Sequence, residues 1–259
     1  KYAGSDVTVR FERNTTNDRC NFDVSSQGVV FDSAESGIIN YNIEQFSNDW
    51  YRISCTYDGG SYFQFNGDVT GGGGSVYIYG AQVESGSYST TLINTSGSSV
   101  TRNADACSIT DVADRINSTE GTIYVEMAAL ANDSTNRYIS INNGTSSKRI
   151  IFKFGTSSNN ISALGLGTAS SFNMSYSGTT ITNMNKIALK YKANDCALWV
   201  NGEEVATDST FTAYAANTLN KITFSNFAET GQFLEANVKN FMLYNTALTD
   251  SELATLTTL

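Results

Sequence analysis

Residues 76–105 decide how the chain is divided, and they read VYIYGAQVESGSYSTTLINTSGSSVTRNAD. The run begins as an alternating strand, with Tyr77, Tyr79, Ala81 and Val83 on one face. The rest is rich in Ser, Thr, Gly and Asn, which favour turns. Such a run is either one long loop inside a domain or the segment that joins two domains.

Strand patterns fill the chain before this run. Apolar residues recur at every second position in residues 7–11, 22–24, 39–43 and 50–57. The pair Asn66-Gly67 predicts a tight hairpin, because that turn needs positive φ at both positions. The glycines at 71–74 are expected to form a flexible connection. The spacing of these short strands predicts an antiparallel sandwich or jelly roll.

A second set of strand patterns begins after Asp105. It comprises residues 121–130, 137–144, 148–155, 170–176, 185–192, 196–205, 220–227 and 238–245. Asn201-Gly202 again predicts a tight hairpin. Three lysines, Lys186, Lys190 and Lys192, share one face of their strand, so we expect that face to lie in water.

One helix is predicted, and it lies in the sequence LTDSELATLTTL at 248–259. Thr249 and Glu252 form a capping box, and Leu248 and Leu253 have the spacing of a hydrophobic staple. Leu253 and Leu256 give the helix an apolar stripe that is expected to pack on the end of its domain.

The run at 76–105 therefore follows one complete set of strands and precedes another. We predict an all-β fold with two β-sandwich (jelly-roll) domains in tandem and a short C-terminal helix. The domains are expected to span residues 1–103 and 104–259. Because the chain starts at Lys1 without methionine, we expect a fragment or a processed product whose first domain is truncated at its N-terminus.

Composition excludes several classes of function. The 259 residues carry a net charge of −9 and contain no histidine. Ser-His-Asp and Cys-His nucleophiles and His-ligated zinc are therefore excluded from this chain. Lys and Arg form no phosphate-binding cluster, so no nucleic-acid partner is expected. No stretch approaches the roughly 20 apolar residues of a membrane span, so membrane insertion is not expected.

The four cysteines, Cys20, Cys55, Cys107 and Cys196, lie far apart, and each fits an apolar strand position. A chain of this size does not resemble a small secreted disulfide framework. We therefore expect buried free thiols, and a Cys20–Cys55 bridge is the alternative.

Several motifs resemble a two-module arrangement found in bacteriophage tail and fibre proteins. IEQFSNDWYRISCTY at 43–57 and VYIYGAQVESGSYSTT at 76–91 are similar to jelly rolls of the carbohydrate-binding-module type. The usual proline of that module is absent, and Asn94 lies near its place. The second half, with EGTIYVEM at 120–127 and NFMLYNTALTDSELATLT at 240–257, resembles laminin G-like (concanavalin A-like lectin/glucanase) domains.

The resemblance implies a non-enzymatic virion surface or tail-fibre protein that binds a host surface polysaccharide or another host-cell glycan. The alternative is a structural module that decorates a capsid or docks on other virion proteins without a sugar site. A glycan-cleaving enzyme is the third hypothesis. A homo-oligomer is expected, because weak single sites suit repetition on a virion. The matching motifs are the fold's own strands and turns, so the resemblance carries over no functional residue.

Aromatic side chains are the candidates for contacts with a sugar. Trp199 alternates against Leu198 and Val200, which leaves open whether it is an exposed platform or a core residue. Trp50 fits a core position better, beside an Arg52 that ties down a loop. Tyr57 and Tyr62 flank the turn at 58–60, where they could form a rim.

Acidic residues offer weaker candidates. Calcium takes oxygen ligands and needs no histidine, and its candidate ligands are Asp23, Asp32, Glu84, Asn132, Asp133 and Asp195. None of them forms a D-x-D-x-D-G loop, so the pattern favours solvated turn acids, and no cofactor is required. Glycoside hydrolysis needs two facing carboxylates. Glu126 stands alone and Glu203 and Glu204 point oppositely, so we predict no enzyme.

Overall fold

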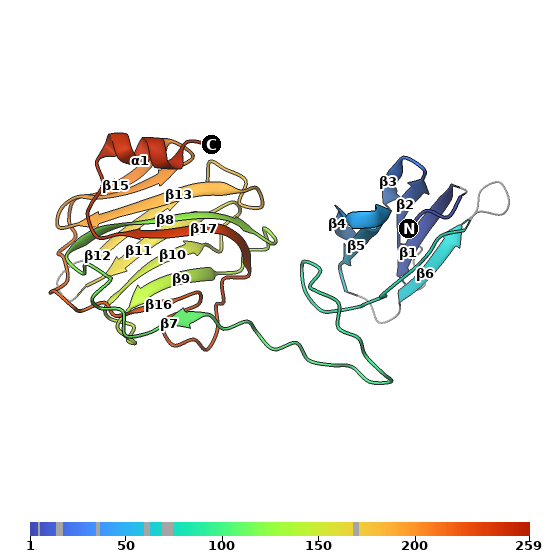
Figure 1. The fold of residues 1–259 in the computed structure, drawn as a ribbon, viewed down its shortest axis with the longest axis horizontal. Helices are drawn as coiled ribbons and strands as arrows, with labels where there is room; N and C mark the ends of the chain where they lie inside the picture. The colour runs from blue at the N-terminus through green and yellow to red at the C-terminus, as the bar shows by residue number, and fades with distance from the viewer. Residues whose placement is uncertain (5, 14–17, 35–36, 60–62, 69–74, 168–170) are drawn as a thin grey trace. The chain divides into compact units, whose positions relative to one another are not determined.

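Figure 1 shows a computed structural model of the chain, which describes residues 1–4, 6–13, 18–34, 37–59, 63–68, 75–167 and 171–259. Residue contacts divide the chain into two units, Lys1–Thr101 and Arg102–Leu259. The predicted boundary, between residues 103 and 104, lies two residues from this division. Both units are built from strands, and α1 (Asp250–Thr257) is near the C-terminus, which confirms the predicted fold class.

The first unit is a small sandwich of two antiparallel sheets. One sheet has the order β3-β2-β1-β6, with β1 at Val7–Arg13, β2 at Asp18–Ser25, β3 at Gly28–Ala34 and β6 at Phe63–Asp68. The other sheet pairs β4 (Ile38–Gln45) with β5 (Tyr51–Tyr57), which follows the short 3-10 turn η1 (Ser47–Asp49). Phe22 of β2 is fully buried and makes edge-on ring contacts with Phe31 of β3 and Tyr41 of β4.

A disulfide between Cys20 and Cys55 joins β2 to β5. The expectation of free thiols is therefore wrong for this pair, and the alternative is confirmed. The two cysteines are 35 residues apart in sequence and come from different sheets, with their Cα atoms 6.8 Å apart. Cys196 is buried and free, as expected, whereas Cys107 is exposed.

The two free thiols should differ sharply in reactivity. Burial raises the pKa of the Cys196 thiol to about 11, so little thiolate forms at neutral pH. We expect a maleimide to label Cys107 in the folded, unreduced protein and to label Cys196 only after unfolding in urea. Intact-mass measurement before and after unfolding counts the added groups, with the Cys107→Ser variant as control. Rapid labelling of Cys196 in the folded protein would contradict this.

Two predicted strand features of the first unit are wrong. Asn66 and Gly67 lie inside β6, where they pair with Arg10 and Val9 of β1, and do not form a hairpin turn. Residues 77–83 lie outside regular strands, although Val76 bridges to Tyr2. The side chain of Gln82 accepts a hydrogen bond from Ile93 N–H, and Glu84 accepts one from Thr90 N–H. In this segment, side-chain hydrogen bonds to backbone N–H groups take the place of the backbone hydrogen bonds between paired strands.

The second unit is a larger sandwich (Figure 1). Its six-stranded sheet has the order β12-β11-β10-β9-β16-β7, and its five-stranded sheet the order β15-β14-β13-β8-β17. The strands are β7 (Ser108–Ile109), β8 (Glu120–Ala129), β9 (Arg137–Asn142), β10 (Arg149–Phe154), β11 (Ile161–Leu166), β12 (Ser171–Tyr176), β13 (Asn185–Lys192), β14 (Cys196–Val200), β15 (Glu203–Asp208), β16 (Lys221–Thr223) and β17 (Ala236–Tyr244).

Strand periodicity separates the core of this unit from its surface. In β10, Ile150, Phe152 and Phe154 enter the apolar core between the sheets. Arg149, Ile151 and Lys153 therefore lie on the outer face of the six-stranded sheet. Asn201 and Gly202 have positive φ between β14 and β15, which confirms the predicted hairpin.

Part of the outer face of the five-stranded sheet is covered by α1, which contacts β13, β14 and β15. The helix begins with the predicted capping box of Thr249 and Glu252. The expectation that the Lys190 side of β13 lies in water is wrong for that residue. Lys190 is buried, and its Nζ lies 2.8 Å from Asp195 and 3.0 Å from Asp250 of α1. No α-helix in the described part of the chain is long and apolar enough to cross a bilayer.

Candidate functional site

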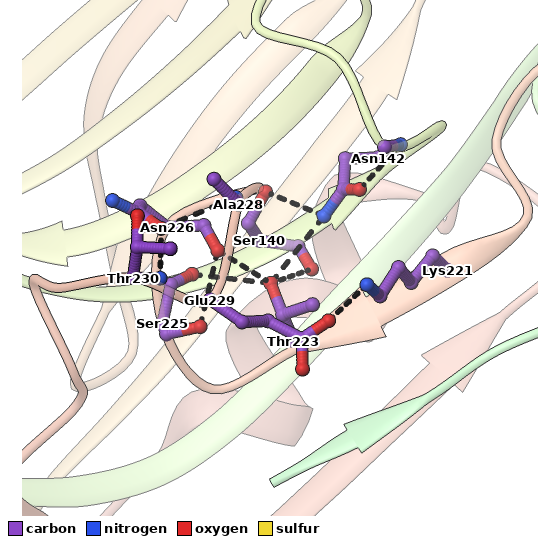
Figure 2. Close-up of polar contacts among 10 residues, drawn as sticks. Ser140, Asn142, Lys221, Thr223, Ser225, Asn226, Ala228, Glu229 and Thr230 are labelled. Atoms are coloured by element: carbon purple, nitrogen blue, oxygen red, sulfur yellow. Dashed lines mark hydrogen bonds and ion pairs between the residues drawn. The ribbon is translucent and has the colours of Figure 1, made fainter. Parts of the chain in front are cut away.

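A loop at residues 225–234 covers part of the outer face of the six-stranded sheet. Figure 2 shows the buried polar cluster that holds this loop on β9 and β16. Thr223 Oγ1 donates toward the carbonyls of Ser140, Ser225 and Asn226, and it accepts a hydrogen bond from Asn142 Nδ2 at 3.3 Å. Ser140, Asn142 and Thr223 are fully buried. The cluster is therefore a structural clamp for the loop.

An ion pair between Lys221 and Glu229 adds to this clamp. The pKa of Glu229 is lowered because Lys221 donates a hydrogen bond to its carboxylate. The charge of Glu229 is thus already matched by a cation of the neighbouring strand.

The rest of this outer face is partly open. Strand register aligns Lys153 with Tyr138 and Ser162, aligns Ile151 with Ser140 and Leu164, and aligns Arg149 with Asn142 and Leu166. Ser171, Asn173 and Ser175 of β12 continue these three rows and are exposed. We call the outward-facing residues that retain exposure the open face: Tyr138, Arg149, Lys153, Leu164, Leu166, Ser171, Asn173 and Ser175.

Two cations of the open face rest on aromatic rings. The guanidinium carbon of Arg149 lies 4.9 Å from the ring centroid of Phe227, which belongs to the covering loop. Lys153 Nζ lies 5.7 Å from the ring centroid of Tyr138 and donates to Asn136 Oδ1 at 3.4 Å. Within the described residues, neither cation forms an ion pair with a carboxylate.

A recess adjoins the open face beside Lys153. It has a volume of about 230 Å³ and is lined by Thr135, Asn136, Gln232, Phe233 and Glu235. Gln232 and Glu235 have positive φ values of 53° and 41°, a conformation that side-chain-bearing residues rarely adopt. Such backbone conformations cluster at functional sites. Asn136 links the recess to the open face, because it lines the first and bonds to Lys153 in the second.

A buried ion pair fixes the loop that carries Thr135 and Asn136. Arg137 is 1% exposed, and its NH1 and NH2 groups donate to the two carboxylate oxygens of Asp133 at 2.8 and 2.9 Å. NH1 also lies 3.3 Å from the carbonyl oxygen of Thr135. Glu235 of the recess lies 3.6 Å from Arg137 Nε, so its charge also faces a cation.

The recess combines the groups that sugar recognition requires. Phe233 offers an apolar ring, and the two amides, the hydroxyl and the carboxylate can bond to pairs of sugar hydroxyls. A concave site with an aromatic residue and a few fixed polar groups is the usual form of a small-ligand site.

None of the predicted aromatic candidates lies in the recess. Trp199 is only 8% exposed because α1 covers it through Leu253, so of the two alternatives it is a core residue and not an exposed platform. Trp50 is half-buried and packs edge-on against Tyr79 at 6.5 Å, and Arg52 ties down the chain at the carbonyl of Thr90 as expected. Tyr57 is half-buried against Phe63, and burial raises its pKa to about 12. Tyr62 lies outside the described residues.

The six candidate calcium ligands bond to protein donors. Asp23 accepts from Thr8, Asp32 from Ser33 and Glu84 from Thr90. Asn132 bonds to Ser158 and Asn159, while Asp133 pairs with Arg137 and Asp195 with Lys190. In the described part of the chain, no three His, Cys, Asp or Glu side chains gather as a metal site would require.

The carboxylates considered for glycoside hydrolysis do not form a pair. Glu126 of β8 is nearly buried and bonds to Lys239 at 2.8 Å. Glu203 and Glu204 lie on β15, which β13 and β14 separate from β8. Three strand spacings amount to about 14 Å, which exceeds the ~5–9.5 Å that separates the two carboxylates of glycosidases.

One charge pattern in the sequence marks the segment that contains both cations of the open face, Arg149 and Lys153. Residues 134–194 contain seven Lys and Arg but no Asp or Glu. The net charge of −9 therefore divides into +7 in this segment and −16 in the remainder. A count over whole domains hides this contrast. No local signal points to Phe233 or Gln232, because the recess forms only where a loop folds back beside β9.

Comparisons with known proteins identify the family of the second unit. A family model described as Concanavalin A-like lectin/glucanases superfamily (Laminin_G_3) matches residues 101–254. No curated protein sequence matches the chain.

The comparison with solved structures finds matches of low sequence identity. The IT-sialidase CBM40 of Ruminococcus gnavus has 16% identity over 60% of this chain and 98% of its own, with a TM-score of 0.48. The leech intramolecular trans-sialidase has 18% identity over 54% of this chain and 23% of its own, with a TM-score of 0.45. The binding domain of botulinum neurotoxin serotype G has 15% identity over 53% of this chain and 36% of its own, with a TM-score of 0.42.

The resemblance of the second half to laminin G-like domains is thus confirmed. The carbohydrate-binding-module resemblance of the first half stays a prediction. Because the family model covers more than half of the sequence, this chain belongs to the concanavalin A-like lectin/glucanases superfamily.

Proposed function

We propose that this protein is a non-enzymatic glycan-binding protein whose second unit binds sugar in the recess and on the adjoining open face. The observation that carries the proposal is the recess itself, where Phe233, two amides and Glu235 surround about 230 Å³ beside an open sheet face. The superfamily includes both lectins and glucanases. The separation of Glu126 from Glu203 and Glu204 favours binding over cleavage.

A glycan array with the whole chain tests the proposal. We expect binding to at least one host polysaccharide, and we expect Phe233→Ala to lower the affinity at least tenfold, because an aromatic ring supplies much of the contact area in such sites. Phe46→Ala is the matched control, because Phe46 is an exposed phenylalanine of the first unit.

Two results would oppose the proposal. Absence of binding to every glycan on the array would refute glycan binding, and full affinity of Phe233→Ala would place it elsewhere. The bound glycans are also assayed for reducing-sugar release with the wild type, Glu126→Gln and Glu203→Gln. Release that is lost in either variant would favour the enzyme hypothesis.

The location of the protein and its assembly state can also be proposed. We propose that the chain is a virion surface or tail-fibre component, outside the host cell, and that it acts as a homo-oligomer. The support is the resemblance of residues 43–57 and 76–91 to phage jelly-roll modules. Antibody labelling of intact particles tests this, and particles that lack the chain would refute it.

One observation favours the structural alternative. Tyr77, Ile78, Tyr79 and Val83 are 62%, 58%, 74% and 69% exposed. Monomeric proteins rarely leave such a run of large apolar side chains in water, so it suits docking on another virion protein or on a second copy. Changing Tyr77 and Tyr79 to Ser should then weaken assembly without affecting glycan binding.

A further inference from the structure

The charges of the second unit are sorted in space. Three carboxylates near the loop at 225–234 face two cations: Glu229 pairs with Lys221, and Asp133 and Glu235 share Arg137. Strands β9 to β12 contain no Asp or Glu. Among the described residues, Arg149 and Lys153 therefore form no ion pair on the open face, and Glu235, the carboxylate of the recess beside Lys153, faces Arg137.

Arg149 and Lys153 are positioned rather than freely solvated. Arg149 rests on Phe227, and its Nε is buried without a hydrogen-bond partner in the described part of the chain. Lys153 rests on Tyr138 and bonds to a neutral amide, Asn136. Both aromatic rings keep the cations on the face while leaving donors for a ligand. A guanidinium presents paired donors that match a carboxylate or a sulfate.

The rest of the open face suits a sugar chain. Ser171, Asn173 and Ser175 offer neutral donors and acceptors, and Leu164 and Leu166 offer apolar surface between them and the cations. Arg149 and Lys153 are four residues apart on β10, so their Cα atoms are about 13 Å apart. Anionic groups on two sugar residues fit this spacing better than a single group.

We infer that the open face binds an acidic oligosaccharide, with Arg149 and Lys153 contacting carboxylate or sulfate groups on different sugar residues. This rests on the proposed glycan-binding function and adds the charge of the ligand. A protein with a net charge of −9 repels polyanions at long range. Binding should therefore depend on these two local contacts and should weaken as salt screens them.

The experiment measures the affinity of the whole chain for four probes by calorimetry. They are a hyaluronan oligosaccharide, its carboxyl-reduced neutral derivative, a heparin oligosaccharide and single-stranded DNA of similar charge. Hyaluronan carries carboxylates alone, whereas heparin carries carboxylates and sulfates, so binding of heparin without binding of hyaluronan would indicate sulfate recognition. We expect one of them to bind, and the neutral derivative and the DNA to bind at least tenfold more weakly.

Variants locate the contact. Arg149→Gln and Lys153→Gln should each lower affinity for the acidic probe about tenfold, which corresponds to one lost charge-assisted hydrogen bond. Lys192→Gln removes the same charge from the other sheet and should change affinity less than twofold. Arg149→Lys keeps the positive charge but loses the paired N–H donors of the guanidinium, so it should retain part of the affinity. It also provides a second variant if Arg149→Gln fails to fold.

Each outcome decides the inference. Binding of the neutral derivative as tightly as of the acidic probe would overturn it and leave the proposed function intact. Unchanged affinity in both Gln variants would overturn it as well. If DNA binds and the Arg149 and Lys153 variants weaken that binding equally, the face recognises polyanions in general, and the inference of an acidic oligosaccharide is overturned. Failure to bind any glycan, on the array or in this assay, would overturn the proposed function and the inference together.

Discussion

Reduction of the Cys20–Cys55 bridge is expected to unfold the first unit while the second unit stays folded. The bridge closes a loop of 35 residues, and chain entropy then gives a stabilisation of about 4 kcal/mol. That approaches the lower end of the stability expected for a domain of this size, which is about 5–15 kcal/mol. The second unit has no disulfide among its described residues, so reduction should not affect it.

The two tryptophans allow each unit to be followed separately. Trp50 belongs to the first unit and Trp199 to the second. Urea unfolding is therefore followed by fluorescence in Trp199→Phe and Trp50→Phe variants, with and without a reducing agent. The double variant Cys20→Ser, Cys55→Ser should reproduce the effect of reduction, and Cys107→Ser serves as control. An unchanged Trp50 transition after reduction would contradict the expected role of the bridge.

Asp133→Ala is expected to destabilise the second unit by about 3 kcal/mol, because it leaves a buried guanidinium without its carboxylate. Arg137 is 1% exposed and bonds to both oxygens of Asp133. Partial compensation by Glu235, 3.6 Å from Arg137 Nε, keeps the expected cost near the lower end of the range for such pairs. Asp133→Asn should cost less, because it retains one acceptor.

The matched control for Asp133→Ala is Asp195→Ala. Asp195 also pairs with a largely buried cation, but Lys190 keeps its second partner, Asp250, after the change. We expect a loss below about 1 kcal/mol for this partly exposed pair. The measurement is urea unfolding in the Trp50→Phe background. Equal effects of the two variants would show that the Arg137 pair has no special weight.

Sequence reasoning predicted most of the second unit, because its strands alternate regularly and its turns carry strong local signals. Asn201-Gly202 formed a hairpin, and Thr249 with Glu252 formed a capping box. These features depend on neighbours within a few residues. Asn66-Gly67 carries the same turn signal but lies inside β6, since pairing with β1 across the sheet outweighs a local preference.

The candidate site was not predicted, and the reason is geometric. Trp199 looked available because its neighbours in the strand face inward, but the covering residue, Leu253, lies more than fifty positions later. The recess joins residues 135–136 to residues 232–235, which only the folded loop brings together. Segments that are distant in the sequence decide which outward-facing side chains are covered. The alternation of apolar and polar residues within a strand carries no information about those segments.

The place of β8 in its sheet has a consequence for how the second unit acquires its structure. β8 is the second strand of the second unit to be synthesised, yet one of its neighbours is β17, where Phe241 pairs with Val125 more than a hundred residues later. Contacts of such long sequence separation slow folding into the range of milliseconds to seconds. At about 5–20 residues per second of synthesis, β8 waits several seconds on the ribosome for this partner. During that interval the backbone N–H and C=O groups along this edge of β8 are unpaired and can bond to strands of other nascent chains.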